Sequence, residues 1–110
     1  MSFKKSAEIS WFAPICDGDD DFLGNRNPLY KSYWENKCKI VQTADKLGFK
    51  NVLCPSSFQV GQDSLSFVAA MTNQTKDINF LPAIRCGEIH PPMLARTIAT
   101  IDHMVKGRLT

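Results

Sequence analysis

The side chains best suited to chemistry fall in three short polar stretches, each of which follows an apolar run. The stretches are residues 14–24, 54–62 and 85–90. If the apolar runs are neighbouring strands of a parallel barrel, their carboxyl ends open onto one cleft, where such barrels hold their active sites. Arg85 would bring a cation into this cleft, beside several small polar side chains. A guanidinium there is suited to bind an anion through two parallel hydrogen bonds.

Other catalytic arrangements find little support. His90 and His103 are the two histidines of the sequence, and neither has a natural partner for a serine or cysteine nucleophile. The aspartates between residues 17 and 21 suggest calcium, but the loop pattern D-x-D-x-D-G followed by a glutamate is absent. We therefore expect no metal site.

The cysteines, at positions 16, 38, 54 and 86, form no C-x-x-C pair and have no zinc-ligand spacing with a histidine. Disulfides are rare in a chain of cytosolic type. We expect free thiols that are buried or partly buried.

Apolar and polar runs alternate regularly along the chain, with glycine, proline and aspartate between them. The pattern predicts strands over 8–15, 49–54 and 78–85, helices over 30–47, 63–73 and 91–106, and the beginning of a fourth strand over 108–110. Such strand–helix alternation indicates right-handed parallel crossovers in an α/β fold. Two closures fit: an open doubly wound sheet, or the first units of an eight-fold barrel. The glycine fingerprint G-x-G-x-x-G that would favour the first is absent after strand 8–15.

The last thirty residues define their elements most clearly. Pro91 and Pro92 suit the first turn of a helix, where a missing N–H costs nothing. Apolar residues then recur with the helical period until Gly107, which supplies the left-handed residue that stops a helix. An extended segment restarts at Arg108, so the sequence ends inside an expected fourth strand.

This region also carries a resemblance. The segment Ala99–Leu109, ATIDHMVKGRL, resembles the "ATLD-x-L-S-x-GR" signature of the bacterial-luciferase-like flavin monooxygenases. With Ala83-Ile84-Arg85, it is most similar to the alkanesulfonate monooxygenase group. The resemblance covers nearly all 110 residues but only about the first third of such an enzyme. It favours the barrel, so residues 1–110 are expected to form the N-terminal portion of a single (β/α)8 TIM-barrel domain, with about three βα units and the start of a fourth strand.

The resemblance implies a two-component enzyme. Such enzymes take reduced FMN from a separate NAD(P)H-dependent flavin reductase and react it with oxygen; the flavin carries the hard chemistry. The alkanesulfonate group oxidises a small organosulfur compound and releases sulfite and an aldehyde. Family members are commonly dimers or tetramers, so a homo-oligomer is expected. The family's catalytic residues match positions beyond Thr110, so this part alone is expected to be inactive.

The resemblance also assigns cofactor residues. Ser56 and Ser57 match the segment that approaches the flavin, although hydroxyls there can equally turn the chain before the next helix. Arg85, preceded by Ile84, matches the arginine that closes the third strand and would face flavin or an anionic substrate. The alternative is a structural salt bridge across the barrel top. Asp102 and Arg108 belong to the signature but lie away from the cleft, as a structural pair or as interface residues.

The substrate is less defined. Cys16 stands where the sulfonate enzymes commonly have a histidine, and the region 60–62, where they carry a cysteine, has no thiol. Trp11 and Phe58 are candidates to line an apolar substrate pocket, although packing is the commoner use of such rings. Methanesulfonate, dimethyl sulfone or another small compound fits as well as a longer alkanesulfonate.

Three other functions stay open: a deazaflavin-dependent reductase on the same barrel, a non-catalytic flavin-binding protein, and an interaction module. The net charge of +2 gives no electrostatic case for nucleic acid or an anionic membrane. Apolar runs fall short of the about 20 residues of a membrane span, and the first ten residues lack the apolar core of a signal peptide. The expected compartment is the cytoplasm.

Overall fold

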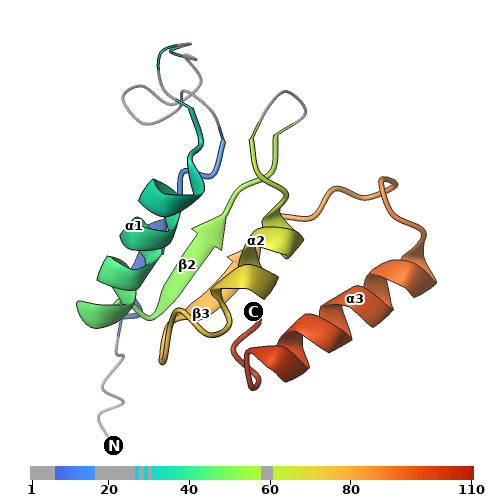
Figure 1. The fold of residues 1–110 in the computed structure, drawn as a ribbon. Coiled ribbons are helices and arrows are strands. Elements are labelled where there is room, and N and C mark those ends of the chain that lie inside the picture. The colour runs from blue at the N-terminus through green and yellow to red at the C-terminus, as the bar shows by residue number, and fades with distance from the viewer. Residues whose placement is uncertain (1–6, 17–26, 28, 30, 58–60) are drawn as a thin grey trace, which may run out of the picture.

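The computed structural model describes residues 7–16, 27, 29, 31–57 and 61–110. Strands and helices alternate in the order β1 (Ser10–Phe12), α1 (Trp34–Lys46), β2 (Asn51–Cys54), α2 (Ser64–Met71), β3 (Asn79–Pro82) and α3 (Pro91–Met104). The strands form a parallel sheet in the order β1-β2-β3. α1 and α2 lie over the same face of this sheet, and α3 follows beside α2 (Figure 1). The expected α/β architecture is therefore present.

The two faces of the sheet differ because side chains alternate along each strand. On the helix side, Val52, Cys54 and Phe80 are completely buried. They belong to one apolar core with residues of all three helices, namely Val41, Ala44, Leu65, Val68, Met71, Ile101 and Val105. Burial of each large apolar side chain stabilises the fold by about 1.5–3 kcal/mol.

The opposite face carries two rows of side chains, in a register set by the strand pairing. The row nearer the amino-terminal ends of the strands, called the lower row, is polar and consists of Ser10, Asn51 and Asn79. The row nearer the carboxyl ends, called the upper row, is apolar and consists of Phe12, Leu53 and Leu81. Within the polar row, Asn51 Nδ2 donates to Ser10 Oγ at 3.2 Å, and Asn79 Nδ2 donates to Asn51 Oδ1 at 3.2 Å. Described helices do not cover this face, which in a closed barrel is the interior.

The starts of α2 and α3 lie within one residue of the predicted positions 63 and 91, and local chemistry explains both. The side chain of Asp63 caps α2 by accepting from Ser66 N at 2.7 Å. α3 begins at Pro91, directly after His90. It ends near Gly107, whose φ of +76° is the left-handed conformation that glycine adopts without strain.

The expected fourth strand begins where the sequence places it. Leu109 forms a parallel bridge with Phe80, in which Phe80 N donates to Arg108 O at 2.7 Å and Thr110 N donates to Phe80 O at 2.8 Å. The Arg108 guanidinium donates to Ile78 O at 2.8 Å, and the Asp102 carboxylate accepts from Leu109 N at 3.1 Å. Both signature residues are therefore structural, and each holds different backbone groups.

A partly buried carboxylate fixes the amino-terminal end of β3. Asp45 accepts three backbone hydrogen bonds, from Lys76, Asp77 and Ile78, at 2.7, 3.0 and 2.7 Å. Burial raises the pKa of Asp45, but these three N–H groups and the positive charge of Arg108 outweigh it and lower the pKa below its usual value. The contact ties α1 to β3 at the edge of the sheet that serves stability in parallel barrels.

Strand ends differ from the sequence prediction. β1 and β3 stop at Phe12 and Pro82, short of the predicted residues 15 and 85, and α1 begins at Trp34 rather than residue 30. Beyond β1 the chain turns, because Ile15 N donates to Ala13 O at 2.8 Å instead of to a neighbouring strand. In the part of the chain that the structure describes, none of the helices has the length and apolar character needed to cross a membrane.

Candidate functional site

The candidate site lies at the carboxyl ends of the three strands. The arrow of β2 points upward in Figure 1, and because the strands are parallel their three carboxyl ends lie together at that end of the sheet. Ala83 N donates to Cys54 O at 2.8 Å, which brings the chain after β3 beside the chain after β2. Ser64, buried at the start of α2, donates its hydroxyl to Ala83 O at 2.9 Å. The ends of β2 and β3 are therefore held together just below the site.

Arg85 and Ser56, both predicted to bind the cofactor, meet at this edge. Arg85 Nε donates to Ser56 Oγ at 3.2 Å, and one terminal nitrogen of Arg85 donates to Ser56 O at 3.0 Å. Arg85 also lies 3.8 Å from a carboxylate oxygen of Glu88, which is half-exposed. A pair this open to water contributes little to stability. Ser56 is thus one partner that orients the guanidinium.

The other two predicted cofactor residues lie differently. Ser57 is exposed beside Ser56. Ile84 is partly buried against the apolar core and lines a groove with Ala95 and Ile98 of α3. The side chain of Ile84 therefore supports the strand end from the helix side, while Arg85 follows it at the edge.

Cys16 has a partner that the sequence did not reveal. It forms an antiparallel bridge with Gly61, and Gln62 N donates to Ile15 O at 2.9 Å. The two places where the sequence departs from the alkanesulfonate pattern are thus neighbours in space, as far as position 16 and the described residues 61–62 are concerned. The glycine in the second stretch was the available signal, since a glycine often marks close backbone approach.

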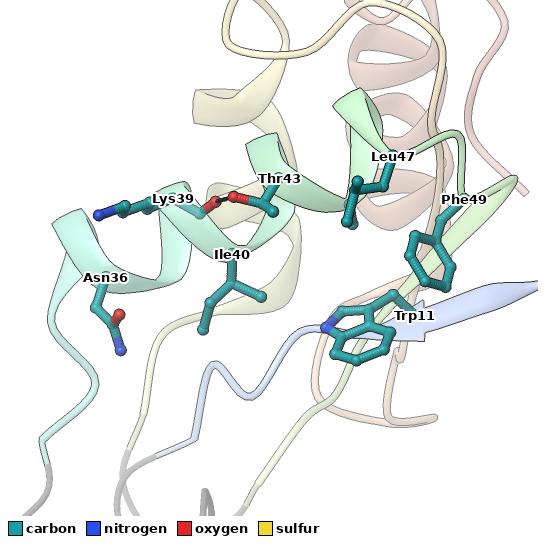
Figure 2. Close-up of a pocket in the computed structure, with 8 residues that line it drawn as sticks. Trp11, Asn36, Lys39, Ile40, Thr43, Leu47 and Phe49 are labelled. Carbon is teal, nitrogen blue, oxygen red and sulfur yellow. Dashed lines mark hydrogen bonds between the residues drawn. The ribbon is translucent and has the colours of Figure 1, made fainter.

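Trp11 lies on the helix side of the sheet. Its ring packs edge-on against Phe49 with centroids 5.1 Å apart, and both line a groove of about 440 Å³ along α1 with Ile40 and Leu47 (Figure 2). This placement is the packing use of the ring, on the face opposite Phe12. The structure does not bring Trp11 together with Arg85. Phe58, the other predicted pocket ring, lies outside the described residues.

The thiols are free, as the sequence predicts. Burial raises the pKa of Cys54 to about 12 and also raises that of Cys38, so both stay protonated and unreactive at neutral pH. Cys86 is exposed and Cys16 is partly exposed. Within the described ranges, acidic, histidine and cysteine side chains form no group suited to a metal ion.

Comparison with known proteins places this geometry in a family. Residues 8–110 match the family described as luciferase-like monooxygenase. The sulfoquinovose monooxygenase of Agrobacterium fabrum (strain C58) is 56% identical over 105 residues, which are 96% of this chain and 27% of that protein. Its namesake in Novosphingobium aromaticivorans is 43% identical over 93% of this chain and 28% of its own length. The chain thus spans about a quarter of the length of these relatives.

Solved structures agree on the fold. The oxygenating constituent of 3,6-diketocamphane monooxygenase from Pseudomonas putida, solved in complex with FMN, matches 69% of this chain and 22% of its own with a TM-score of 0.62 and 26% identity. EDTA monooxygenase from Chelativorans sp. BNC1 matches 92% of this chain and 28% of its own with a TM-score of 0.71 and 19% identity. The three parallel strands are consistent with part of the TIM barrel of such proteins, which confirms the predicted fold class. The chain belongs to the luciferase-like monooxygenase family.

Proposed function

We propose that the protein, at the full length of its relatives, is a two-component flavin monooxygenase that oxidises sulfoquinovose or a closely related sugar sulfonate. The observation that carries the proposal is the 56% identity to a sulfoquinovose monooxygenase over 96% of this chain. Sulfoquinovose is an organosulfonate, so the proposal narrows the expected class of small organosulfur substrates.

The described residues fit reduced FMN as the cofactor. Arg85 and the hydroxyls of Ser56 and Ser57 stand at the carboxyl edge of the sheet, where barrel enzymes bind phosphates and cofactors. Ser56 holds the guanidinium by two hydrogen bonds, which limits the freedom lost when Arg85 binds an anion. Ile84 would act by supporting this strand end. When bound, reduced FMN supplies the two electrons and activates oxygen.

The chemistry balances with these components. The carbon that bears the sulfonate becomes an aldehyde carbon, sulfite leaves, and the two atoms of oxygen end in the aldehyde and in water. This chain would contribute orientation and charge, because Arg85 is a fixed cation for the flavin or for the sulfonate. Cys16 would line the substrate side of the site. The remaining catalytic groups would come from the part of the protein beyond Thr110.

A flavin reductase that uses NAD(P)H would be the partner, and a homo-oligomer is the expected assembly. The cytoplasm, where NAD(P)H is available, is the compartment that this proposal implies. The net charge of +2 gives no reason to add nucleic acid or a membrane to these partners.

The test supplies the full-length protein with a flavin reductase, NADH, FMN and oxygen. Sulfite release is then measured with sulfoquinovose, methanesulfonate and, as a sulfur-free control, glucose, while dimethyl sulfone, which carries no sulfonate, is followed by oxygen consumption. We expect sulfite from sulfoquinovose at a rate well above that from methanesulfonate, and none from glucose. Oxygen consumption without sulfite from any sulfonate would contradict the substrate class. Tight binding of reduced FMN without oxygen consumption would instead indicate a non-catalytic flavin protein, and turnover only with reduced deazaflavin would indicate a reductase.

A further inference from the structure

A closed ring of hydrogen bonds joins three separate parts of the chain below the candidate site. Ile15 O accepts from Gln62 N at 2.9 Å and from Ser32 Oγ at 2.7 Å. Gln62 Nε2 donates to Ser32 O and to Ser32 Oγ, both at 3.0 Å. The side-chain bonds are partly buried. Residue 15 follows β1, residue 32 precedes α1, and residue 62 precedes α2. The ring therefore joins the connection between β1 and α1 to the connection between β2 and α2.

Gly61 allows the chain before α2 to approach the chain after β1 closely. Its φ is +146°, and a Cβ atom at this position would lie 2.8 Å from Cys16 Cα and 2.9 Å from Ile15 O. Both neighbours are backbone atoms, which cannot rotate away as a flexible side chain can. Any larger residue at position 61 must therefore push Cys16 and the end of β1 aside.

We propose that Ser32, Gly61 and Gln62 form a clamp that positions Cys16 between the chain after β1 and the chain before α2, and thereby sets the shape of the substrate side of the site. The substrate contact of Cys16 rests on the proposed function, whereas the position of Cys16 does not. The clamp residues act through Cys16 and are positioning residues.

The clamp lies apart from the contacts that stabilise the fold as a whole, so its role in positioning Cys16 can be tested separately. The apolar core and the Asp45 contact hold the helix side and the amino-terminal edge of the sheet. The clamp lies at the carboxyl edge, and its acceptors are two main-chain carbonyls and the Ser32 hydroxyl. Gln62→Ala removes the two side-chain hydrogen bonds to Ser32, keeps the backbone bond from residue 62 to Ile15 O, and leaves that core intact. We therefore expect a local change in the position of Cys16.

The decisive experiment measures the alkylation of Cys16 by iodoacetamide in the full-length protein. Peptide mass spectrometry gives the rate at Cys16 relative to that at exposed Cys86, which serves as internal reference. We expect this ratio to change several-fold in Gln62→Ala. A matched control is Gln42→Ala, since Gln42 Nε2 on α1 also joins two distant parts of the chain, to Gln74 Oε1 at 2.9 Å, but through an exposed bond outside the clamp. An unchanged ratio in Gln62→Ala would overturn the proposal.

A glycine pair tests the close approach. Gly61→Ala should change the Cys16 ratio at least as much as Gln62→Ala. Gly48→Ala is the control, because Gly48 also has a positive φ, +82°, but a Cβ there meets nothing within 4 Å. Equal Cys16 ratios in the two variants, with melting temperatures that show both folded, would contradict a positioning role for Gly61.

Kinetics link the clamp to the reaction. With reduced FMN and sulfoquinovose, Gln62→Ala should raise the KM for sulfoquinovose about tenfold. It should also increase the amount of hydrogen peroxide formed per sulfite, because a displaced substrate is held less often in a geometry that can react with the activated oxygen. The affinity for reduced FMN should stay within about twofold of the unsubstituted protein. Gln62→Glu, which keeps the length but loses the Nε2 donor, should behave like Gln62→Ala; a Gln62→Glu protein with unaltered KM and alkylation would refute the ring. If the unsubstituted protein makes no sulfite, the proposed function fails while the alkylation result still decides the clamp.

Discussion

Arg85 lies beside Ser56, and its predicted contact with flavin or an anionic substrate stays a prediction. It lies at the end of β3, and its guanidinium is held by the hydroxyl and carbonyl of Ser56. The nearby carboxylate of Glu88, at 3.8 Å, is half-exposed and too weak to consume the charge of the guanidinium. A cation at the carboxyl edge is consistent with anion binding, and its bonds to Ser56 use the planar fork that a lysine lacks.

Replacement of Arg85 tests this role in the full-length protein. We expect Arg85→Lys to weaken the binding of reduced FMN by about tenfold, because lysine keeps the charge but loses the planar fork that Ser56 orients. Anaerobic fluorescence titration measures the Kd. Arg96→Ala removes a cation from the exposed surface of α3 and should leave the Kd unchanged. A normal Kd in Arg85→Lys would restrict Arg85 to its bond with Ser56.

The lowered pKa of Asp45 leads us to expect that the free energy of unfolding depends on pH. A carboxyl whose pKa is lowered in the folded state stabilises the protein above its unfolded pKa of about 3.9, and this contribution disappears as the pH falls through the folded value. We expect Asp45→Asn to lower the free energy of unfolding by about 2 kcal/mol at pH 7, after allowance for partial exposure. The difference from the unsubstituted protein should shrink as the pH falls below the unfolded pKa and through the lowered folded pKa of Asp45.

The matched control for Asp45 is Asp77→Asn, since the side chain of Asp77 is exposed. Melting temperatures of the three full-length proteins between pH 3 and 8 provide the measurement. A constant gap between Asp45→Asn and the unsubstituted protein over this range would show that the charge of Asp45 does not carry the contact.

At the scale of elements, the sequence predicted the type and the order of the helices and strands correctly, but it predicted several of their end residues wrongly. Pro91 and Gly107 delimit α3 through local chemistry, and the structure agrees because proline and glycine act on their own backbone. The bridge between Cys16 and Gly61 joins residues 45 positions apart, and periodicity carries no information on such a contact. The same cause shortens β1, whose predicted last residues leave the sheet to meet the chain before α2.

The N-cap of α2 gives a prediction at this scale. Asp63→Ala should cost about 1 kcal/mol of stability, because Ser66 N loses its acceptor at the helix start. Asp63→Asn keeps an acceptor oxygen and should recover most of that loss. Thermal unfolding of the full-length variants checks both values. Equal melting temperatures of the Asp63→Ala and Asp63→Asn proteins would show that the cap does not limit stability.

At the scale of the whole molecule, the sheet presents a face that the described helices do not cover. Its upper row, Phe12, Leu53 and Leu81, is apolar, and its lower row is joined by side-chain hydrogen bonds. An apolar row above a polar row suits the layered interior of a barrel better than a surface in water. That residues 1–110 form part of one such domain remains a prediction, and this face provides its test.

Substitution of Leu81 tests whether the uncovered face of the sheet is a surface in water or the interior of a barrel. In this structure its exposed fraction is 42%, so truncation would cost little if the face stayed in water. If the remaining strands close over the row, Leu81→Ala in the full-length protein should lower the free energy of unfolding by about 2–5 kcal/mol, as for other buried leucines. Leu29→Ala is the matched control, because Leu29 is 84% exposed in a connection rather than on the sheet. Denaturant unfolding of both variants would decide the point: similar small losses would mean that the face is not enclosed, whereas a large loss confined to Leu81→Ala would place the row inside the barrel.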